Sequence, residues 1–506
     1  MTDDVAPPDL DESGPLEALI DNIHPPNWRN PVPRSPYHLV VIGAGPAGVT
    51  AAREAAELGA RVALIESAQI GGVRLNAGCV SSKAVIRSAR FYAEMRAAED
   101  CGWQSVGNAD AHFPAMMARM QRIRARLSRI ASAQRLREAG VDVYFGAARF
   151  RGGDLVAVAD ATLQFGKAII ATGTRPLIPA IPGLAAAGYL TNETVFALRE
   201  CPRRLLVLGG GPLGCEMAQA YCRIGAQVFI VQEEPMFLPR EERDAAQILS
   251  DALAKDGVAI HPNTNAVAVR TDGDSKIVDL QCDGDRFSVT VDAILVGVGR
   301  APNIENLRLD TVMVDATADV GITVDDLLRT SNPHIYAAGD VCMADKYTHA
   351  AEASARIAVA NALFLGRQRV SALAIPCCTY TDPEIAHVGL YLRDMWDRSI
   401  PVKTFTVLMH DVDRAVTDGE DEGFVKIHVR EGTDRILGAS VVASRAGEMI
   451  NELSLAISAG VGLRQLARVI HTYPTQAQAI KMAADAYNRT RLTPRRKAVI
   501  ASWLDR

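Results

Sequence analysis

Short apolar runs alternate with glycine-rich turns and helical patterns over the first part of the chain. Tyr37–Ile42 is one such run, and after a glycine turn and a helical stretch comes a second run at 61–65. The same order returns further along, with runs at 205–208 and 227–231 around another glycine turn and helix. Runs of this length, joined through helices, are typical of parallel strands covered by helices. The pattern therefore predicts an α/β protein with two similar strand–helix–strand units.

The first glycine turn has the spacing of a dinucleotide-binding loop. Gly43 allows the tight turn, Gly45 lets the backbone approach a pyrophosphate, and Gly48 lets helix and strand pack closely. The following helix directs the partial positive charge of its N-terminus at the ligand. Glu66 directly follows the second run, where a carboxylate binds the ribose of an adenosine. A glycine turn without a ligand is the less favoured alternative.

The second unit repeats the three glycines, at Gly209, Gly211 and Gly214. Two dinucleotide sites in one chain indicate a flavin and a nicotinamide. Gln232 stands at the position equivalent to Glu66, and Glu233 and Glu234 follow it. An NADP site requires Arg or Lys for the 2′-phosphate, which these acids would repel. We therefore favour NADH over NADPH.

From about residue 375 the pattern changes to alternating strands and late helices. Strands are predicted at 424–429 and 436–442, and a helix at 446–459, which together indicate an α+β unit. On a further strand, Cys377 and Cys378 are interpreted as two small apolar residues, with a second redox pair as the less favoured alternative.

The two ends of the chain differ from the rest. Residues 1–36 are rich in proline and acids around one amphipathic piece at 16–23, which indicates a leader or surface strap without chemistry. The basic C-terminal tail predicts a surface helix in preference to a membrane anchor.

Composition narrows the class of protein. The 506 residues are 48% hydrophobic and 22% charged, with a net charge of −5, and several domains are expected. No dense basic patch indicates a nucleic-acid partner, no apolar run is long enough for a membrane span, and no signal peptide is visible, so a cytoplasmic location is expected. The nine cysteines are scattered without zinc-site spacing, which argues against a disulfide framework or a metal.

Residues 71–83 read Gly-Gly-Val-Arg-Leu-Asn-Ala-Gly-Cys-Val-Ser-Ser-Lys and precede a predicted helix over 84–99. This stretch resembles the redox-active segment of the flavin-dependent pyridine nucleotide–disulfide oxidoreductases, the family of dihydrolipoamide dehydrogenase, glutathione reductase and mercuric reductase. Further segments resemble family markers in the same order, at 171–173, 297–303, 330–340 and 379–384. The resemblance covers residue 37 to about residue 490.

The resemblance implies two Rossmann-like domains that bind FAD and NAD(P)H, and a C-terminal α+β dimerisation domain that makes the enzyme a homodimer. The implied division is a leader at 1–36, an FAD-binding domain at 37–190, an NAD(P)-binding domain at 191–302, a returning FAD-binding part at 303–374, an interface domain at 375–493 and a tail at 494–506.

The resemblance also implies roles for single residues. Asp340 would hold the ribityl chain of the flavin, and Lys83 and Glu216 would form the ion pair beside flavin N5 where the nicotinamide docks. A helix near 349–356 would direct its N-terminus at the flavin ring. The other implied cofactor-binding residues are Gly72, Ala171, Thr172, Gly173, Gly299 and Gly339.

The sequence departs from the family at the reaction centre. The family uses two cysteines as a redox disulfide, whereas here Arg74 replaces the first and only Cys79 remains. The family's catalytic His–Glu pair, contributed by the partner subunit, is replaced by Tyr473 and Gln478. A neutral tyrosine is a poor base. These changes argue against lipoamide or glutathione disulfide reduction, and the C-terminal cysteine pair of mercuric reduction is missing.

Three functions stay open. The favoured one is an FAD enzyme that passes electrons from NAD(P)H to a small acceptor: a quinone, a pyridine nucleotide or oxygen. The first alternative is a single-cysteine reductase in which Cys79 reacts with the substrate. In that reductase, Arg74 would favour the thiolate form of Cys79 or bind an anionic substrate. The simpler interpretation is that Cys79 has no role in the reaction. The second alternative is a catalytically inactive dimer that binds FAD and NAD and acts as a redox sensor.

Overall fold

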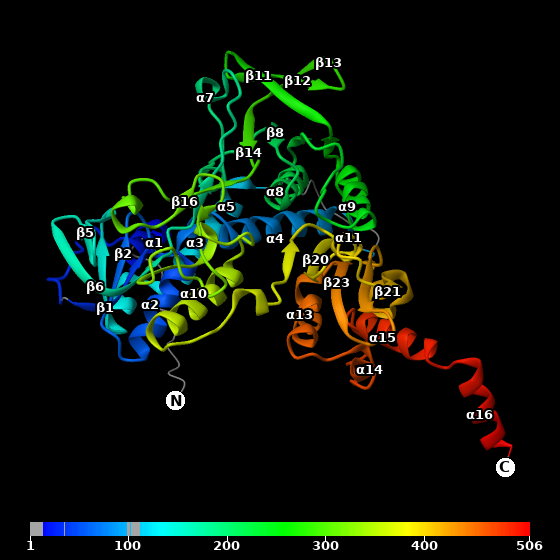
Figure 1. The fold of residues 1–506 in the computed structure, drawn as a ribbon. Coiled ribbons are helices and arrows are strands. Elements are labelled where there is room, and N and C mark those ends of the chain that lie inside the picture. The colour runs from blue at the N-terminus through cyan, green and yellow to red at the C-terminus, as the bar shows by residue number, and fades with distance from the viewer. Residues whose placement is uncertain (1–13, 35, 99–101, 103–111, 506) are drawn as a thin grey trace.

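The computed structural model describes residues 14–34, 36–98, 102 and 112–505. Figure 1 shows the sheets and the helices that cover them. The first sheet has seven strands in the order β3-β2-β1-β6-β5-β4, with β18 paired to β6. Its parallel part contains β3 (Val141–Phe145), β2 (Val62–Glu66), β1 (Tyr37–Ile42), the long β6 (Ala161–Ile170) and β18 (Ile335–Ala337). Of these strands, β1 and β18 pair directly with β6. The short strands β4 (Ala148–Phe150) and β5 (Leu155–Val158) extend it antiparallel.

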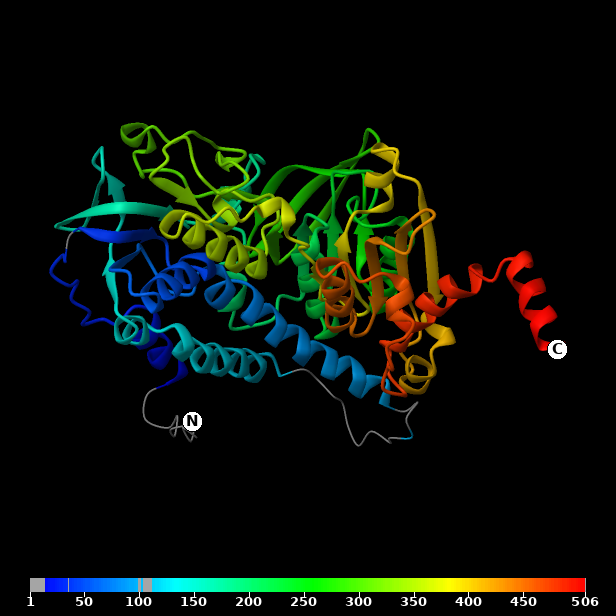
Figure 2. The same ribbon diagram turned by 60° about the horizontal axis from the view of Figure 1, so that its bottom comes forward.

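Helices cover the parallel strands because both faces of those strands are apolar. Every residue of β2 is buried, which is what a strand between two helical layers requires. The covering helices are α1 (Pro15–Ile23), α2 (Pro46–Glu57), α5 (Phe113–Ser128), α6 (Ala133–Glu138) and α10 (Thr348–Leu363). The short α3 (Gly72–Asn76) leads into α4 (Cys79–Arg96), which Figure 2 shows running from this sheet toward the C-terminal part. The helix α4 starts at Cys79 and not at Ala84, where its start was predicted from the sequence. The predicted end at residue 99 lies outside the described residues.

The second sheet repeats the same construction. Its parallel strands are ordered β10 (Ala259–His261), β9 (Gln227–Val231), β8 (Arg204–Leu208) and β14 (Ala293–Val296), flanked by α8 (Pro212–Arg223) and α9 (Arg243–Asp256). An antiparallel sheet of β11 (Thr264–Asp272), β12 (Ser275–Cys282) and β13 (Asp285–Val291) extends from it. The strands β7 (Thr174–Pro176) and β15 (Arg300–Pro302) pair where the two units meet. The two strand–helix–strand units predicted from the sequence are present.

The C-terminal unit combines a sheet with helices, as the alternating pattern predicted. Its order is β19 (Cys377–Thr379), β20 (Glu384–Gly389), β23 (Ile436–Ala443), β22 (Phe424–Arg430) and β21 (Val402–Leu408), all antiparallel. Its helices are α11 (Leu392–Asp397), α12 (Asp413–Asp418), α13 (Ala446–Ser458), α14 (Leu463–Leu466), α15 (Gln478–Thr490) and α16 (Pro494–Leu504). The domain boundaries drawn from the sequence stay predictions.

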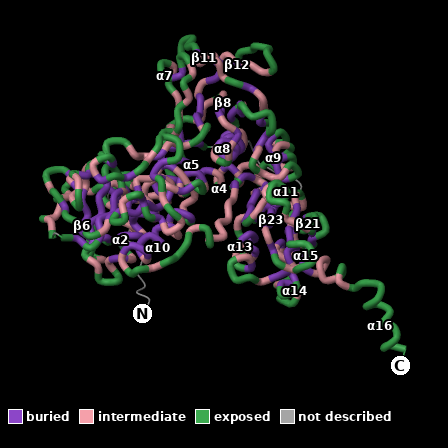
Figure 3. Tube along the Cα trace, in the orientation of Figure 1, coloured by how far each residue is buried: buried purple, intermediate pink, exposed green. Residues whose placement is uncertain are grey.

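Burial follows the sheets, as Figure 3 shows, and the two ends of the chain behave differently. Leu19 and Ile23 of α1 are buried in the first core, whereas α16 contains no buried residue and projects from the body. The surface helix predicted for the tail is therefore present. None of the described helices has the combination of length and apolar character that a membrane crossing requires.

Candidate active site

The first glycine loop adopts the geometry that its spacing predicted. Gly43 has φ 102°, and a Cβ there would lie 2.4 Å from the carbonyl oxygen of Ala171. A Cβ at Gly48 would lie 1.7 Å from the Gly43 carbonyl, so the helix can pack this closely only without a side chain. A Cβ at Gly72 would lie 2.8 Å from the Cα of Gly45. The loop therefore lies directly against the start of the segment that leads to Cys79.

The Glu66 carboxylate fixes the backbone beside this loop. It accepts hydrogen bonds from the N–H groups of Ala44 and Ala68, both at 2.7 Å. Burial raises the pKa of this carboxyl group, while the N–H donors oppose that shift. A role in binding the ribose stays a prediction, since the protein's own backbone uses this carboxylate in the structure described.

The second glycine loop has the same local geometry. Gly209 has φ 101°, and a Cβ there would lie 2.6 Å from the Gly297 carbonyl oxygen. A Cβ at Gly214 would lie 2.0 Å from the Gly209 carbonyl. A Cβ at Gly211 would meet nothing within 4 Å among the described atoms. The backbone of Gly211 is thus open to a ligand, as a phosphate cradle requires.

The buried Gln232 side chain lies over this second loop. A Cβ at Gly210 would lie 2.2 Å from Gln232 Oε1, and Gln232 Nε2 donates to the Met236 carbonyl at 2.6 Å. The neighbouring Glu233 is exposed. Position 232 is therefore close enough to the loop to contact a bound nucleotide, and the preference for NADH stays a prediction.

Three separated markers come together between the two units. Thr172 Oγ1 donates to the Asn303 carbonyl at 2.7 Å, and Asn303 Nδ2 donates to the Thr172 carbonyl at 2.9 Å. The next contact is from Thr174 Oγ1 to Asp340 Oδ2 at 3.2 Å. Burial raises the pKa of Asp340, and nearby Arg300 opposes the shift. The residue predicted to bind the ribityl chain is thus a half-buried carboxyl group with a fixed hydrogen-bond partner.

Three predicted glycines border these contacts. Gly173 has φ 67° and Gly299 has φ 141°, both in the region that favours glycine. The N–H of Gly339, with φ 75°, donates to Ser354 Oγ on α10 at 2.9 Å, and a Cβ there would lie 3.1 Å from the Cβ of Ala47. Gly339 therefore lets the turn before Asp340 lie between α2 and α10.

Arg74 and Cys79 both face the first turns of α10, and each has its own partner. Arg74 Nη1 lies 3.2 Å from Glu352 Oε1 in an ion pair. Cys79, which is exposed, places its Sγ 3.5 Å from Thr348 Oγ1. No hydrogen bond between Arg74 and Cys79 is found among the described residues. The arginine is therefore held by a carboxylate, and the thiol by a hydroxyl group.

Lys83 and Glu216 form the ion pair that the resemblance implied. Lys83 Nζ lies 2.9 and 2.7 Å from the two carboxylate oxygens of Glu216, which is only 4% exposed. Tyr380, which the sequence did not single out, completes the group. Its N–H donates to Glu216 Oε1 at 3.0 Å, and Lys83 Nζ lies 4.3 Å from its ring centroid. The 379–384 marker was the signal that could have identified this tyrosine.

Tyr473 and Gln478 lie at the start of the last helices of the C-terminal unit. The Tyr473 side chain is 65% exposed, and its hydroxyl donates to Asp413 Oδ2 at 2.7 Å. The hydrogen bond to Asp413 raises the pKa of the phenol further above its ordinary value. Gln478 is the first residue of α15. Within this chain, the raised pKa of Tyr473 makes the neutral phenol a poor general base, although a carboxylate accepts its hydrogen bond.

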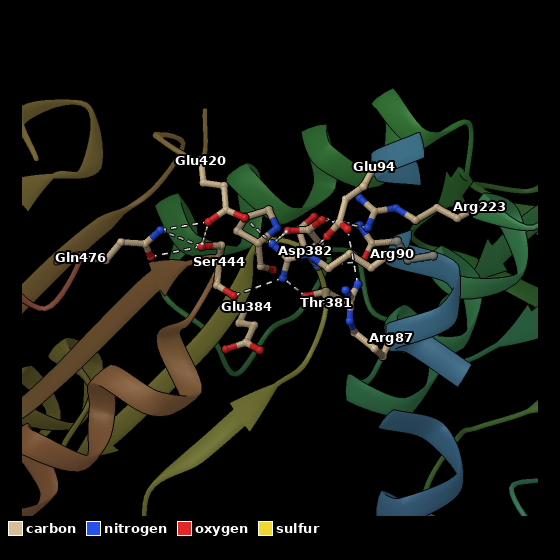
Figure 4. Close-up of polar contacts among 12 residues, drawn as sticks. Arg87, Arg90, Glu94, Arg223, Thr381, Asp382, Glu384, Glu420, Ser444 and Gln476 are labelled. Atoms are coloured by element: carbon tan, nitrogen blue, oxygen red, sulfur yellow. Dashed lines mark hydrogen bonds and ion pairs between the residues drawn. The ribbon is translucent and has the colours of Figure 1, made fainter. Parts of the chain in front are cut away.

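A polar network joins α4 to the C-terminal unit, as Figure 4 shows. Arg90 lies between two carboxylates, 2.6 Å from Glu420 and 3.5 Å from Asp382. Gln476, three residues after Tyr473 and buried, donates to Glu420 Oε2 at 3.0 Å. The segment that carries Tyr473 is thus connected to the helix that carries Cys79 and Lys83. Sequence patterns gave no signal for this connection.

The described cysteines outside residues 71–83 include one adjacent pair, Cys377 and Cys378. All eight cysteines among the described residues are free thiols. Cys377 and Cys378 are neighbours on β19, so their side chains point to opposite faces of the strand. Burial raises the pKa of Cys377 to about 11 and also raises that of Cys378. Both are therefore neutral thiols, and their interpretation as two small apolar residues stays a prediction.

The residues around Cys79 fit a bound flavin nucleotide. Among the described residues, two buried side-chain oxygens have no hydrogen-bond partner, Asn76 Oδ1 and Ser81 Oγ, and they flank Cys79. Buried polar atoms are rarely left unpaired, so these two atoms are available to a ligand. Together with the glycine loop, they meet the requirements of the predicted FAD site.

Comparison with known proteins matches most of the chain. Residues 37–359 match the family described as pyridine nucleotide-disulphide oxidoreductase, and residues 375–484 match the dimerisation domain of that family. The chain is 33% identical to a mercuric reductase of Streptomyces lividans, over 89% of this chain and 96% of that protein. It is also 33% identical to a dihydrolipoyl dehydrogenase of Bacillus subtilis, over 88% of this chain and 95% of that protein. The crystal structure of LpdA from Mycobacterium tuberculosis is similar with a TM-score of 0.80 and 29% identity, over 89% of this chain and 99% of that one.

Proposed function

Because the chain belongs to the pyridine nucleotide-disulphide oxidoreductase family, we propose that it moves electrons from NAD(P)H to a small acceptor without a protein disulfide. The protein is a flavoprotein oxidoreductase, and its cofactors are FAD and NAD(P)H. Its C-terminal unit is a dimerisation domain, which supports a homodimer. The bound flavin supplies the two-electron chemistry between nicotinamide and acceptor.

The replacement at Arg74 carries the proposal. A disulfide against the flavin needs two thiols in the 71–83 segment, and Cys79 is the only one there. The guanidinium at the other position is held by Glu352 at 3.2 Å. To replace the missing sulfur, a free thiol elsewhere in the chain would have to come within disulfide-bonding distance of Cys79. The flavin itself is then the last site within the protein that holds the electron pair.

The nicotinamide side of the reaction centre keeps its charged pair. Lys83 places a cation beside the position expected for flavin N5, and the nearly buried Glu216 keeps Lys83 in place. A fixed cation stabilises negative charge that develops on a reduced ring. This arrangement favours a catalytically active reductase over an inactive redox-sensing dimer.

The acceptor side lacks a group for thiol–disulfide chemistry. Tyr473, which would face the flavin of the partner subunit, donates a hydrogen bond to Asp413, which raises the pKa of the phenol, and the neutral phenol is a poor base. Acceptors that take electrons directly from a flavin need no such base. Quinones, a second pyridine nucleotide and oxygen are the acceptor classes we propose, with NADH as the favoured donor because Glu233 is exposed beside the second loop.

A single-cysteine reductase is the second candidate function. Cys79 is exposed and lies 3.5 Å from the Thr348 hydroxyl, so a substrate can reach the thiol. In this candidate, Cys79 would form a mixed disulfide or a sulfenic acid with its substrate. The two candidates differ in whether turnover needs this sulfur.

Rapid mixing of the FAD-loaded protein with NADH or NADPH tests the proposal. Fast bleaching of the flavin, followed by reoxidation with menadione, thio-NAD⁺ or oxygen, is expected in both the wild type and Cys79→Ser. Absence of bleaching with either nicotinamide would support the redox-sensing dimer. Loss of acceptor turnover in Cys79→Ser, with bleaching intact, would support the single-cysteine reductase.

A further inference from the structure

The N-terminal strap, defined here as residues 14–34, precedes the family match yet is built into the first domain. The match begins at residue 37. In α1, Leu19 and Ile23 are 2% and 1% exposed and belong to the same core as the first glycine loop's helix. A segment attached only as a leader would not bury its apolar side chains in this way. The strap is thus a fixed part of the fold that lies outside the matched family region.

The strap covers the free edge of the first sheet. Its side chains pair with backbone groups of the edge strand β3: Trp28 Nε1 donates to the Val143 carbonyl at 3.1 Å. Asn30 makes two hydrogen bonds to Phe145, accepting from its N–H at 2.8 Å and donating to its carbonyl at 2.9 Å. These contacts are at the carboxyl end of the strand. Ligands of parallel α/β sheets bind outside the carboxyl ends of the strands.

The strap also holds the loop that follows Glu66. The Ile70 N–H donates to the Ile23 carbonyl at 3.1 Å, and His24 Nδ1 contacts the Ala68 carbonyl. The N–H of that same Ala68 donates to Glu66 Oε1 at 2.7 Å. A single residue therefore connects His24 to the carboxylate expected to bind the adenosine ribose.

His24 presents an aromatic surface at this place. Its ring stacks on Phe145 with centroids 4.2 Å apart and an interplanar angle of 14°. Phe145 is half-buried at the end of β3, while His24 is exposed. An exposed stacked ring beside a ribose-binding carboxylate is suited to contact an adenine, because aromatic faces stack on one another.

We propose that the strap is part of the FAD site, where it fixes loop 67–70 and closes the adenosine end through His24. The chemical group recognised is the adenosine half of FAD, and the flavin half is bound elsewhere, near Asp340 and Lys83. The proposal rests on the predicted role of Glu66 and does not depend on which acceptor the enzyme uses.

Binding of FAD and FMN to the apoprotein tests this assignment, because FMN lacks the adenosine half. His24→Ala is expected to weaken FAD binding about tenfold, which corresponds to about 1.4 kcal/mol, and to leave FMN binding unchanged. Arg29→Ala, exposed on the same strap, is the matched control and should change neither. Flavin fluorescence measures both affinities without nicotinamide or acceptor, so the result is independent of turnover.

Two results would overturn the assignment. One is FAD binding by His24→Ala as tight as that of Arg29→Ala. The other is an equal loss of FAD and FMN affinity, which would show a general loosening of the fold. If His24→Ala fails to fold, His24→Leu keeps most of the apolar contact with Phe145 but removes the aromatic face and the contact with Ala68, and the same selective loss of FAD affinity over FMN affinity is then expected.

Discussion

Arg74 and Glu352 form an ion pair at 3.2 Å between the segment before Cys79 and the first turns of α10. The two residues are 278 positions apart in the chain. Both are partly exposed, so the pair contributes little to stability by itself. Its importance in the proposed function is chemical, because the resemblance implies a thiol at this position and the chain has a guanidinium there. The proposed reaction therefore proceeds without a sulfur bridge.

Cys79→Ser tests whether the remaining sulfur takes part. A thiolate beside oxidised flavin produces a long-wavelength charge-transfer band, so loss of such a band in Cys79→Ser would identify a thiolate at Cys79. For catalysis, we expect no loss of quinone turnover when this sulfur is removed. Thr348→Val is the matched control, since it removes the hydroxyl 3.5 Å from Cys79 and keeps the thiol. Turnover that falls to background only in Cys79→Ser would assign the reaction to the sulfur.

Lys83→Met should slow flavin reduction by NADH about a hundredfold, because a fixed cation beside the flavin is lost. The measurement is single-turnover bleaching in a stopped-flow instrument. Lys83→Arg keeps the charge and should retain most of the rate, because Glu216 can still pair with it. A bleaching rate in Lys83→Met equal to that of the wild type would remove the proposed role of this pair.

Arg90→Ala should destabilise the junction between α4 and the dimerisation domain by about 2 kcal/mol, since Glu420 and Asp382 lose a shared partner. Thermal unfolding of the FAD-loaded protein measures the change. Arg87→Ala is the control on the same helix: Arg87 lies 3.4 Å from Glu94 and is 56% exposed, so its removal should have almost no effect. Equal melting temperatures for the two variants would contradict the account of the network.

Glu384 should make stability fall as the pH rises. Burial raises its pKa to about 7 from an ordinary value of 4.5, while the N–H of Gly447 donates to it at 2.8 Å. Between these two pH values the folded chain holds one more proton than the unfolded chain, so ionisation costs folding up to about 3 kcal/mol. Glu384→Gln should remove this loss, and therefore be more stable than the wild type at pH 8. Parallel stability curves from pH 5 to pH 8 would contradict the assignment.

The sequence predicted those parts of the fold that depend on neighbouring residues. Gly43 and Gly209 were identifiable because only glycine readily takes their positive φ angles at a turn this tight. The strands β1 and β8 were identifiable because short, continuous apolar runs between helices usually form buried parallel strands. The Lys83–Glu216 pair came from the resemblance and not from any pattern, and the structure brings the two side chains together.

Contacts that depend on how distant elements pack could not be predicted. Arg74 contacts Glu352 only because α10 packs beside the short helix α3 that precedes Cys79. The strap was expected to be a leader or a surface strap without chemistry, because its prolines and acids give no sign that Trp28 and Asn30 pair with a strand edge. Likewise, the partners of Arg90 come from separate segments of the C-terminal unit and have no common sequence signature.

The central claim is that the flavin is the last protein-held site for the electron pair. Anaerobic titration of the FAD-loaded wild type with dithionite tests it most directly. FAD stores two electrons, and a redox disulfide stores two more. Arg74→Cys, which restores a second thiol five residues before Cys79, provides the control that should take up four electrons per FAD. The account predicts that the wild type takes up two, and an uptake of four by the wild type would contradict it.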